Sequence, residues 1–213
     1  MLERISNLEN RFISQPSSEV LEKLPWLLGT KTQRYFEIGV GVGATVLEVA
    51  KALNNSGEIH IWSRQQDCDE LVGDLSNLGI HNVVAHGNPD KTYSGYHFTF
   101  LTSFCEGSLP SFDLAYVDGG HVAHLDLGTV AILKNVAHEG SIIVLDDFNW
   151  TLAKSPTLNP DINAQTAYNY DESQIVQPHV ALICKALLDN DPSWSLVEIK
   201  NNSAVYEFQG KGR

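Results

Sequence analysis

The stretch Tyr35-Phe-Glu-Ile-Gly-Val-Gly-Val-Gly43 decides the fold class of this 213-residue chain. Its first four residues form a short, mostly apolar run that predicts a buried strand, and residues 44–53 repeat apolar side chains at helical spacing. The glycines lie between the two, where the backbone can approach a ligand closely and the first turn of the helix presents free amides. A strand, a glycine-rich turn and a helix in this order predict a ligand-binding α/β domain.

The spacing of the glycines narrows the kind of ligand. A phosphate-binding P-loop requires GxxxxGK[ST], which this stretch does not match. The dinucleotide motif GxGxxG requires a glycine at Ala44, but alanine is tolerated there, so an NAD-dependent enzyme stays an alternative. A tight turn that binds no ligand is the other alternative.

Strands alternate with helices along the rest of the chain. Further strands are predicted at residues 58–62, 82–86, 112–117 and 141–145, and helices at 67–78, 93–105 and 124–136. Because these strands are apolar on both faces, they indicate a parallel sheet covered by helices on each side. Residues 194–200 and 204–208 alternate around Asn201-Asn202-Ser203 and predict a hairpin. The expected fold is α/β: a doubly wound, mostly parallel, seven-stranded Rossmann-like sheet with a C-terminal antiparallel hairpin.

The chain is expected to divide into an N-terminal helical extension, residues 1–30, and a single domain, residues 31–213. Five apolar side chains share one face of a first predicted helix: Leu2, Ile5, Leu8, Phe12 and Ile13. Ser17 and Ser18 can cap a second helix over residues 19–28, in which Pro25 would introduce a kink. The apolar faces of these helices would cover one side of the domain or a second copy in a homo-oligomer.

The segment after residue 148 is expected to be irregular. Residues 149–171 are polar and predict a loop, which is either a lid over a substrate or an ordered surface loop. Its Trp150, Lys154, Tyr168 and Tyr170 are candidates for shaping an acceptor pocket. A helix over residues 172–188, interrupted at Pro178, is expected to follow.

Composition excludes several classes of protein. The chain has 26 acidic and 14 basic side chains, a formal net charge of −12, whereas nucleic-acid binding depends on clustered lysine and arginine. The acidic excess also disfavours anionic membrane surfaces. The three cysteines are widely spaced, which argues against a disulfide framework or a thiolate zinc site. No apolar signal core and no uninterrupted apolar run of about 18 residues occurs, so a cytoplasmic location is expected.

Three aspartates follow two of the predicted strands directly. Asp118 comes after strand 112–117, and Asp146 and Asp147 come after strand 141–145. Because the carboxyl ends of neighbouring parallel strands converge on one crevice, these carboxylates are expected to lie close together. They would repel one another unless a cation neutralised them, and oxygen ligands favour Mg²⁺, Mn²⁺ or Ca²⁺ over zinc. The alternative is that all three only cap the turns that follow.

These motifs resemble those of a known family. Glu37, Gly39, Gly41 and Gly43 are similar to the first motif of the class I S-adenosylmethionine-dependent methyltransferases, and the similarity spans roughly residues 33–150. Val-Asp118-Gly-Gly-His followed by Val-Leu-Asp146-Asp147-Phe resembles the metal-dependent O-methyltransferases of the macrocin type. The catechol O-methyltransferase type is more distant, with Asn in the place of Asp147.

The resemblance implies roles for these residues. The three glycines and Asp118 would lie against S-adenosylmethionine, and Glu37 would orient the loop near its methionine amino group. Asp118, Asp146 and Asp147 would ligate the metal, most simply Mg²⁺. The implied activity is methyl transfer to a hydroxyl of a small-molecule acceptor, such as a sugar, a natural product or a diol.

Two histidines are candidates for the base that accepts the hydroxyl proton. The macrocin type has an aspartate where Gly120 stands here. His121 is the nearest replacement and His124, one helical turn further, is the second candidate, because histidine titrates near neutral pH. The alternatives are that these histidines are structural hydrogen-bond partners, or an HxxH zinc pair with Asp118.

The second predicted strand departs from the family pattern. Class I enzymes usually end it with an acid that holds the ribose, whereas here it ends Ile61-Trp-Ser-Arg64. Ser63 can supply one hydrogen bond, Asp67 can reach back from the next helix, and Trp62 either stacks on adenine or is simply buried. Asn88 is a candidate for the adenine side. The missing acid motivates an alternative function: a non-methylating ligand-binding protein, or another enzyme, on the same fold.

Overall fold

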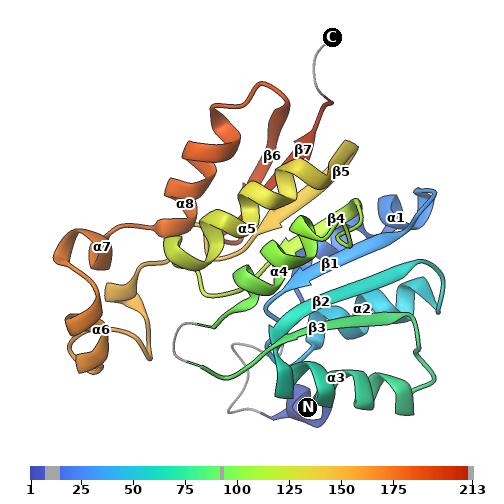
Figure 1. The fold of residues 1–213 in the computed structure, drawn as a ribbon, viewed down its shortest axis with the longest axis horizontal. Coiled ribbons are helices and arrows are strands. Elements are labelled where there is room, and N and C mark those ends of the chain that lie inside the picture. The colour runs from blue at the N-terminus through green and yellow to red at the C-terminus, as the bar shows by residue number, and fades with distance from the viewer. Residues whose placement is uncertain (8–14, 92–93, 211–213) are drawn as a thin grey trace.

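A computed structural model describes residues 1–7, 15–91 and 94–210 of the chain (Figure 1). Its centre is a seven-stranded sheet with the order β3-β2-β1-β4-β5-β7-β6. The strands are β1 Arg34–Ile38, β2 Glu58–Arg64, β3 Val83–Asn88, β4 Phe112–Val117, β5 Ala137–Leu145, β6 Trp194–Lys200 and β7 Ser203–Phe208. The first five run parallel, and β7 is antiparallel to both of its neighbours, β5 and β6. The predicted doubly wound sheet with a terminal hairpin is confirmed.

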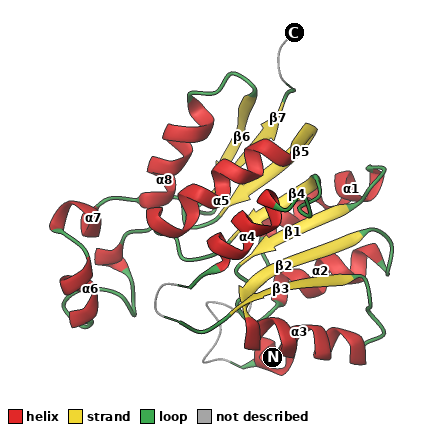
Figure 2. Cartoon of the chain, viewed as in Figure 1, coloured by secondary structure: helices red, strands yellow, loops and turns green. Residues whose placement is uncertain are grey.

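Helices cover both faces of the sheet, and each face has its own apolar core (Figure 2). One core contains residues of α1 Ser18–Gly29, α2 Ala44–Leu53 and α3 Gln65–Asn77. The other contains residues of α4 Tyr96–Cys105, α5 Ala123–Val136 and α8 His179–Cys184. The central strands are buried on both faces, as their apolar sequences predict.

The expected helix before the first strand is α1. Ser17 is its N-cap and accepts a hydrogen bond from the Val20 amide, and Pro25 lies inside the helix. The short 3₁₀ helix η1, Leu2–Ser6, precedes it. Of the first predicted helix, Leu8, Phe12 and Ile13 lie outside the described residues.

Two predictions about local structure were wrong. The expected loop 149–171 contains the 3₁₀ helix η3, Leu152–Lys154, and the helix α6, Ala164–Asn169, which Asn163 caps by accepting from the Gln165 amide. Residues 137–140 extend β5 instead of closing the preceding helix, because Ala137 pairs with Phe112 of β4. The predicted interruption at Pro178 is confirmed: α7, Glu172–Val176, ends before it, and α8 continues into the π-helical turn η4, Lys185–Asp189.

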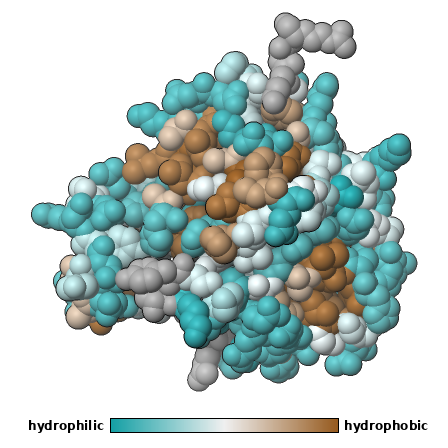
Figure 3. Space-filling view, viewed as in Figure 1, coloured by the Kyte–Doolittle hydropathy of each residue, from teal (hydrophilic) through white to brown (hydrophobic). Residues whose placement is uncertain are grey.

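The surface of the described residues has apolar side chains on the face of α4, α5 and α8. Phe98, Leu101, Leu127 and Leu182 are all exposed there, and Figure 3 shows apolar side chains gathered over these helices. No helix among the described residues has both the length and the apolar character to cross a membrane.

Candidate functional site

A cavity of about 760 Å³ lies at the carboxyl ends of the parallel strands. Strand register explains which residues meet there: Ile38 pairs with Val117, and Val117 pairs with Leu145. The residues that follow these three in sequence are therefore neighbours at the rim. Of the predicted site residues the cavity is lined by Glu37, Gly39, Gly41, Ser63, Asn88, Asp118, His121, His124, Asp146 and Asp147.

The glycine turn packs directly on the end of β4. Gly39 has a φ of +85°, and a Cβ at this position would overlap the carbonyl oxygen of Asp118. The amide of Gly39 donates to the carbonyl of Trp62 at 2.8 Å, and the amide of Asp118 donates to the carbonyl of Ile38 at 2.8 Å. Only glycine fits both this φ and this close approach.

Gly43 lies apart from the other glycines of the motif. It is the N-cap of α2 with a φ of +83°, and a Cβ there would collide with Leu71 of α3. It does not line the cavity. Gly43 thus packs against α3, and its contact with a ligand stays a prediction.

Glu37 is a buried carboxyl group in the wall of the cavity. It is 2% exposed and accepts a hydrogen bond from the Tyr35 hydroxyl at 2.5 Å. Burial raises the pKa of Glu37 to about 8, against the opposing effect of that hydrogen bond. A cationic group that enters the cavity would favour the charged form of this carboxyl.

The three aspartates gather at the ends of β4 and β5. Burial raises the pKa of Asp118 well above its ordinary value, and the negative charges of Asp146 and Glu37 raise it further. Burial also raises the pKa of Asp147, where His121 acts in the opposite direction. Asp146 accepts a hydrogen bond from the Ser203 hydroxyl at 2.6 Å. Such mutual repulsion is what a bound cation would relieve.

His121 lies between two of these aspartates. Its Nε2 is 3.6 Å from Oδ1 of Asp118 and 3.7 Å from Oδ2 of Asp147. His121 and Asp147 both have left-handed backbones, with φ values of +54° and +55°. Such conformations are unfavourable for these residue types and concentrate at functional sites.

The three aspartates are not as tightly gathered as another acidic group. Among the described residues, the one set of potential metal ligands whose atoms all lie within 4.8 Å of one another is Glu3, Glu70 and Asp74. These acids surround the Met1 amine, which is 2.7 Å from both Glu3 and Asp74. The ammonium group and Arg4 therefore already offset part of the charge of that cluster, whereas His121 lies between two of the cavity aspartates.

His124 lines the cavity from the first turn of α5, three residues after His121, which precedes the helix. Burial lowers its pKa, so it stays neutral and able to accept a proton near pH 7. Its ring lies 6.0 Å from that of Tyr170, and the ring of His121 lies 5.8 Å from that of Trp150. Two of the four candidate residues of the segment 149–171 thus contact the histidines, whereas Tyr168 is 86% exposed.

The edge of the cavity at β2 is lined by Ser63 and Arg64 and by no described carboxylate of that strand. Ser63 lines the cavity, and its hydroxyl donates to Asp67 at 3.4 Å. Asp67 does reach back from α3, but its carboxylate also binds Arg64 at 2.7 Å, and Asp67 does not line the cavity. Asn88 lines the cavity from the end of β3 and is 4% exposed.

Trp62 is buried in the apolar core between the sheet and the helices α4, α5 and α8. It has no exposed surface, and its ring stacks on that of His86 at 4.3 Å and 6°. Phe36 contacts it edge-on at 4.9 Å. Of the two alternatives for Trp62, burial is therefore the one observed, and a ligand in the cavity cannot stack on it.

Sequence reasoning missed several residues of the site. Tyr96 lines the cavity, accepts a hydrogen bond from the Gly120 amide at 2.7 Å and donates to the buried carboxylate of Asp126. This phenol fixes the loop between Asp118 and His121. Glu19, Asn201 and Ser203 also line the cavity, and they come from opposite ends of the sequence, so no local pattern could have identified them.

A family model described as a methyltransferase domain matches residues 36–148. None of the curated proteins compared matches this chain.

Solved structures with the same architecture include several O-methyltransferases. TomG from Streptomyces achromogenes, an O-methyltransferase involved in tomaymycin synthesis and solved with SAM, has a TM-score of 0.65 at 15% identity, covering 98% of this chain and 89% of that chain. Cofactor-bound Rv0187 from MTB has a TM-score of 0.60 at 15% identity, covering 95% and 87%. The O-methyltransferase from Bacillus cereus, solved in complex with SAH, has a TM-score of 0.55 at 13% identity, covering 98% and 100%. At these identities the likeness shows the fold.

Proposed function

Because this chain belongs to the methyltransferase domain family, we propose that it transfers a methyl group from S-adenosylmethionine to a hydroxyl oxygen of a small molecule, with the help of a divalent cation. The observation that carries the proposal is one cavity that joins the glycine turn to the three aspartates. A cofactor site and a cation site that share a cavity are what metal-assisted methyl transfer requires.

The cavity suits S-adenosylmethionine in size and charge. Its volume of about 760 Å³ lies within the range of small-molecule sites and leaves room for an acceptor beside the cofactor. When bound, S-adenosylmethionine supplies an electrophilic methyl group on a sulfonium cation. Gly39 and Gly41 would lie against it, Glu37 would face its amino group, and Ser63 and Asn88 would face the nucleoside end.

The donor set at the rim suits Mg²⁺ or Mn²⁺. Asp118, Asp146 and Asp147 offer only oxygen atoms, which these hard cations prefer. The raised pKa of Asp118 reflects the burial and uncompensated charge that a cation would offset. When bound, the cation would lower the pKa of an acceptor hydroxyl and hold it in place.

His121 is the proposed base. Its Nε2 lies 3.6 Å from Asp118 and 3.7 Å from Asp147, so the ring faces the aspartate cluster. A hydroxyl held there would lie within reach of this nitrogen. His124 is the second candidate, because its lowered pKa keeps it neutral.

The acceptor is proposed to carry several hydroxyl groups. The cavity wall that comes from α1 and the β6–β7 turn is polar and includes Ser17, Ser18 and Asn201. Such groups favour hydrogen bonding to a sugar or a polyhydroxylated natural product over a purely aromatic diol.

Isothermal titration calorimetry tests the proposal directly. We expect S-adenosylmethionine to bind the folded protein, and Mg²⁺ or Mn²⁺ to bind wild type but not Asp118→Asn. The absence of binding heat from S-adenosylmethionine, with and without Mg²⁺, would refute methyl transfer. For the base, His121→Asn should slow turnover by roughly a hundredfold or more on an accepted substrate and leave S-adenosylmethionine affinity unchanged.

A second candidate function rests on the edge at β2. Ser63 is the only described β2 hydroxyl in the cavity wall, and Asp67 is engaged by Arg64, so no described residue at this edge offers the ribose a carboxylate without a partner. The second candidate is a ligand-binding protein without methyltransferase activity. In that case the protein would bind S-adenosylmethionine but would not form S-adenosylhomocysteine when a catechol or a hydroxylated sugar is added.

A further inference from the structure

We propose that the turn between β6 and β7, Asn201-Asn202-Ser203, positions Asp146 and Asp147 for a divalent cation and ties them to the start of α1. The inference rests on the proposed function, since it concerns the cation site of that function. It assigns to a hairpin turn far along the sequence a role in the geometry of the aspartates.

The backbone of the turn is tight and specific. Asn201 and Asn202 have φ values of +45° and +67°, the left-handed region that asparagine tolerates best among residues with a side chain. Lys200 pairs with Ser203 across the turn, so it is a two-residue connection. The turn therefore presents its three polar side chains in a fixed arrangement.

Sheet register brings this turn to the aspartates. Leu145 of β5 pairs with Ala204 of the antiparallel β7, so the next residues outward, Asp146 and Ser203, are neighbours. The Ser203 hydroxyl donates to Oδ1 of Asp146 at 2.6 Å. Ser203 is itself buried, at 1% exposure, so little water competes for this bond.

Asn202 binds the residues that leave β5. Its Nδ2 donates to Oδ1 of Asp147 at 3.1 Å, and its Oδ1 accepts from the Asn149 amide at 2.8 Å. Its carbonyl accepts from the Phe148 amide at 2.6 Å. Together these bonds hold the segment in which Asp147 has its unfavourable φ of +55°.

The turn binds only one carboxylate oxygen of Asp147. Asn202 binds Oδ1, whereas Oδ2 is the atom that faces Nε2 of His121 at 3.7 Å. A carboxylate held by one oxygen can present the other to a cation in a fixed direction. Groups that orient metal ligands in this way are needed for affinity, although they do not touch the metal.

Asn201 connects the same turn to α1. Its Nδ2 donates to Oε1 of the buried Glu19 at 2.8 Å and to the Ser18 hydroxyl at 3.2 Å. Ion pairs on either side, Lys23 with Glu198 and Lys200 with Glu22, reinforce the contact between α1 and the hairpin. Because residues 17–19 form a wall of the cavity, the turn joins that wall to the cation site.

Binding of Mn²⁺, followed by electron paramagnetic resonance, tests the proposal without an acceptor. Ser203→Ala and Asn202→Gly each remove a side-chain donor, and glycine keeps the left-handed turn. We expect each variant to bind Mn²⁺ roughly tenfold to a hundredfold more weakly than wild type.

Two variants serve as matched controls at the other end of the sheet. Asn55 has a φ of +63°, its amide group donates to the Gly79 carbonyl at 2.8 Å, and its Oδ1 accepts from the His81 amide. Ser141 is buried and donates to the Phe112 carbonyl at 2.7 Å. Asn55→Gly and Ser141→Ala should lower the melting temperature as much as the turn variants and leave Mn²⁺ affinity unchanged.

The outcomes separate this inference from the proposed function. If wild type binds Mn²⁺ and the turn variants bind it equally well, or no worse than the controls, the turn has no positioning role. If wild type binds S-adenosylmethionine but not Mn²⁺, the inference fails and methyl transfer stands. If wild type binds neither ligand, the proposed function fails together with the inference.

Discussion

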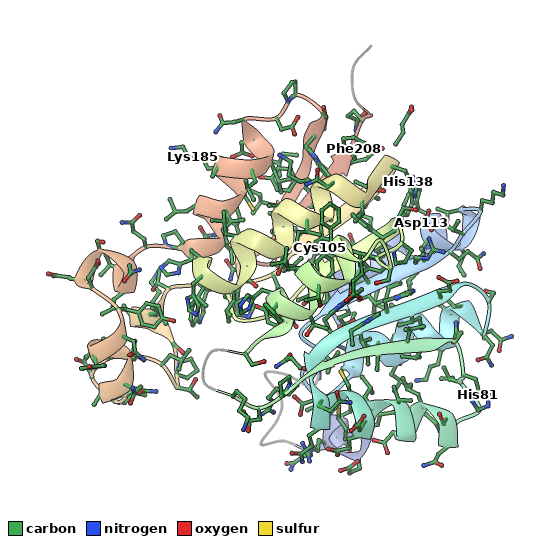
Figure 4. The ribbon with its side chains drawn as sticks, viewed as in Figure 1. His81, Cys105, Asp113, His138, Lys185 and Phe208 are labelled. Carbon is green, nitrogen blue, oxygen red and sulfur yellow. The ribbon has the colours of Figure 1, made fainter. Side chains whose placement is uncertain are left out.

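Two aspartate–histidine pairs lie at opposite ends of the same strand, β4. Asp113 and His138 form the pair at the amino end, where Figure 4 shows them close together. The Asp113 carboxylate accepts hydrogen bonds from the Thr32 hydroxyl at 2.5 Å and the Arg34 amide at 2.7 Å, and lies 3.2 Å from His138 Nε2. It is 2% exposed, and two of its partners, the Thr32 hydroxyl and the Arg34 amide, are hydrogen-bond donors.

Asp118 and His121 form the pair at the carboxyl end. Here the nearest charged neighbours of Asp118 include Asp146 and Glu37, and their charges add to burial in raising its pKa. His121 is 3.6 Å away, beyond hydrogen-bond distance. The same two residue types at the two ends of β4 thus give a structural contact at one end and a cluster of mutually repelling carboxylates at the other. Such a cluster costs stability and is retained where a ligand offsets it.

The largest effect should come from removing the charge at the carboxyl end. Asp118→Asn is expected to weaken Mn²⁺ binding by about a thousandfold, which corresponds to about 4 kcal/mol. The same change should raise the melting temperature of the metal-free protein by about 2–4 °C, because it relieves repulsion. Calorimetry with Mn²⁺ and thermal unfolding measure the two effects. If Asp118→Asn instead lost stability and kept its Mn²⁺ affinity, the carboxyl end of β4 would hold the structural contact and not the cation site.

One methyl group added at Gly39 should disrupt the close contact between the glycine turn and Asp118. Gly39→Ala should lower the free energy of unfolding by about 3 kcal/mol, because a Cβ overlaps the Asp118 carbonyl at a φ of +85°. Gly73→Ala in α3 is the control: nothing lies within 4 Å of its Cβ, so it should stabilise by about 0.5–1 kcal/mol. Urea unfolding measures both. Equal effects would mean that the turn has no special backbone constraint.

Breaking the Asp113–His138 pair at the amino end of β4 should lower stability and leave the cavity unchanged. Asp113→Ala removes the acceptor of the Thr32 hydroxyl and the Arg34 amide, so it should cost about 2–3 kcal/mol of unfolding free energy. Urea unfolding gives the cost, and Mn²⁺ affinity at a temperature where the variant is folded should equal that of wild type. Weakened Mn²⁺ binding would show that the two ends of β4 are coupled.

Replacing His86, a histidine without an acidic partner among the described residues, should have the smallest effect on stability, and only at low pH. Burial and the neighbouring His60 lower the pKa of His86 from 6.5 to about 4. Below pH 6.5 the unfolded chain therefore binds a proton that the native state does not, so stability falls as the pH drops from 6.5 to 4. The loss is about 2 kcal/mol, allowing for partial exposure.

Unfolding at a series of pH values in His86→Gln measures this loss. The decrease in stability between pH 6.5 and 4 should be about 2 kcal/mol smaller in the variant than in wild type. His81→Gln, at an exposed histidine at the edge of the sheet (Figure 4), should behave as wild type. An unchanged profile in His86→Gln would mean that His86 titrates normally in the native state.

Helices and strands were predicted correctly where the local pattern of apolar residues was strong. The helix at 44–53 and the strand at 112–117 were predicted with their observed bounds, because glycine and polar residues delimit clear periodic segments. The extension of β5 over residues 137–140 depends on pairing with Phe112, and α6 is a short helix within a polar segment. Neither depends on periodicity, so the sequence could not indicate them.

The candidate site was predictable to the extent that it lies at strand ends. Asp118 and Asp146 follow strands, and parallel register places them together. Tyr96 lies in an apolar helix, where an aromatic residue normally indicates only packing. Asn202 contacts Asp147 across 55 residues of sequence, and such pairs depend on the completed sheet.

The position of β7 has a consequence for the order of folding. β7 follows all other strands in the sequence, yet it lies between β5 and β6 and is not at the edge of the sheet. Until β7 is in place, β5 has an unpaired edge that can associate with other chains. Contacts between residues as far apart as Asn201 and Glu19 form slowly, because a long loop must close first. During biosynthesis the parallel strands β1 to β5 can therefore assemble early, whereas Asp146 and Asp147 acquire their hydrogen bonds to the hairpin only when β7 inserts.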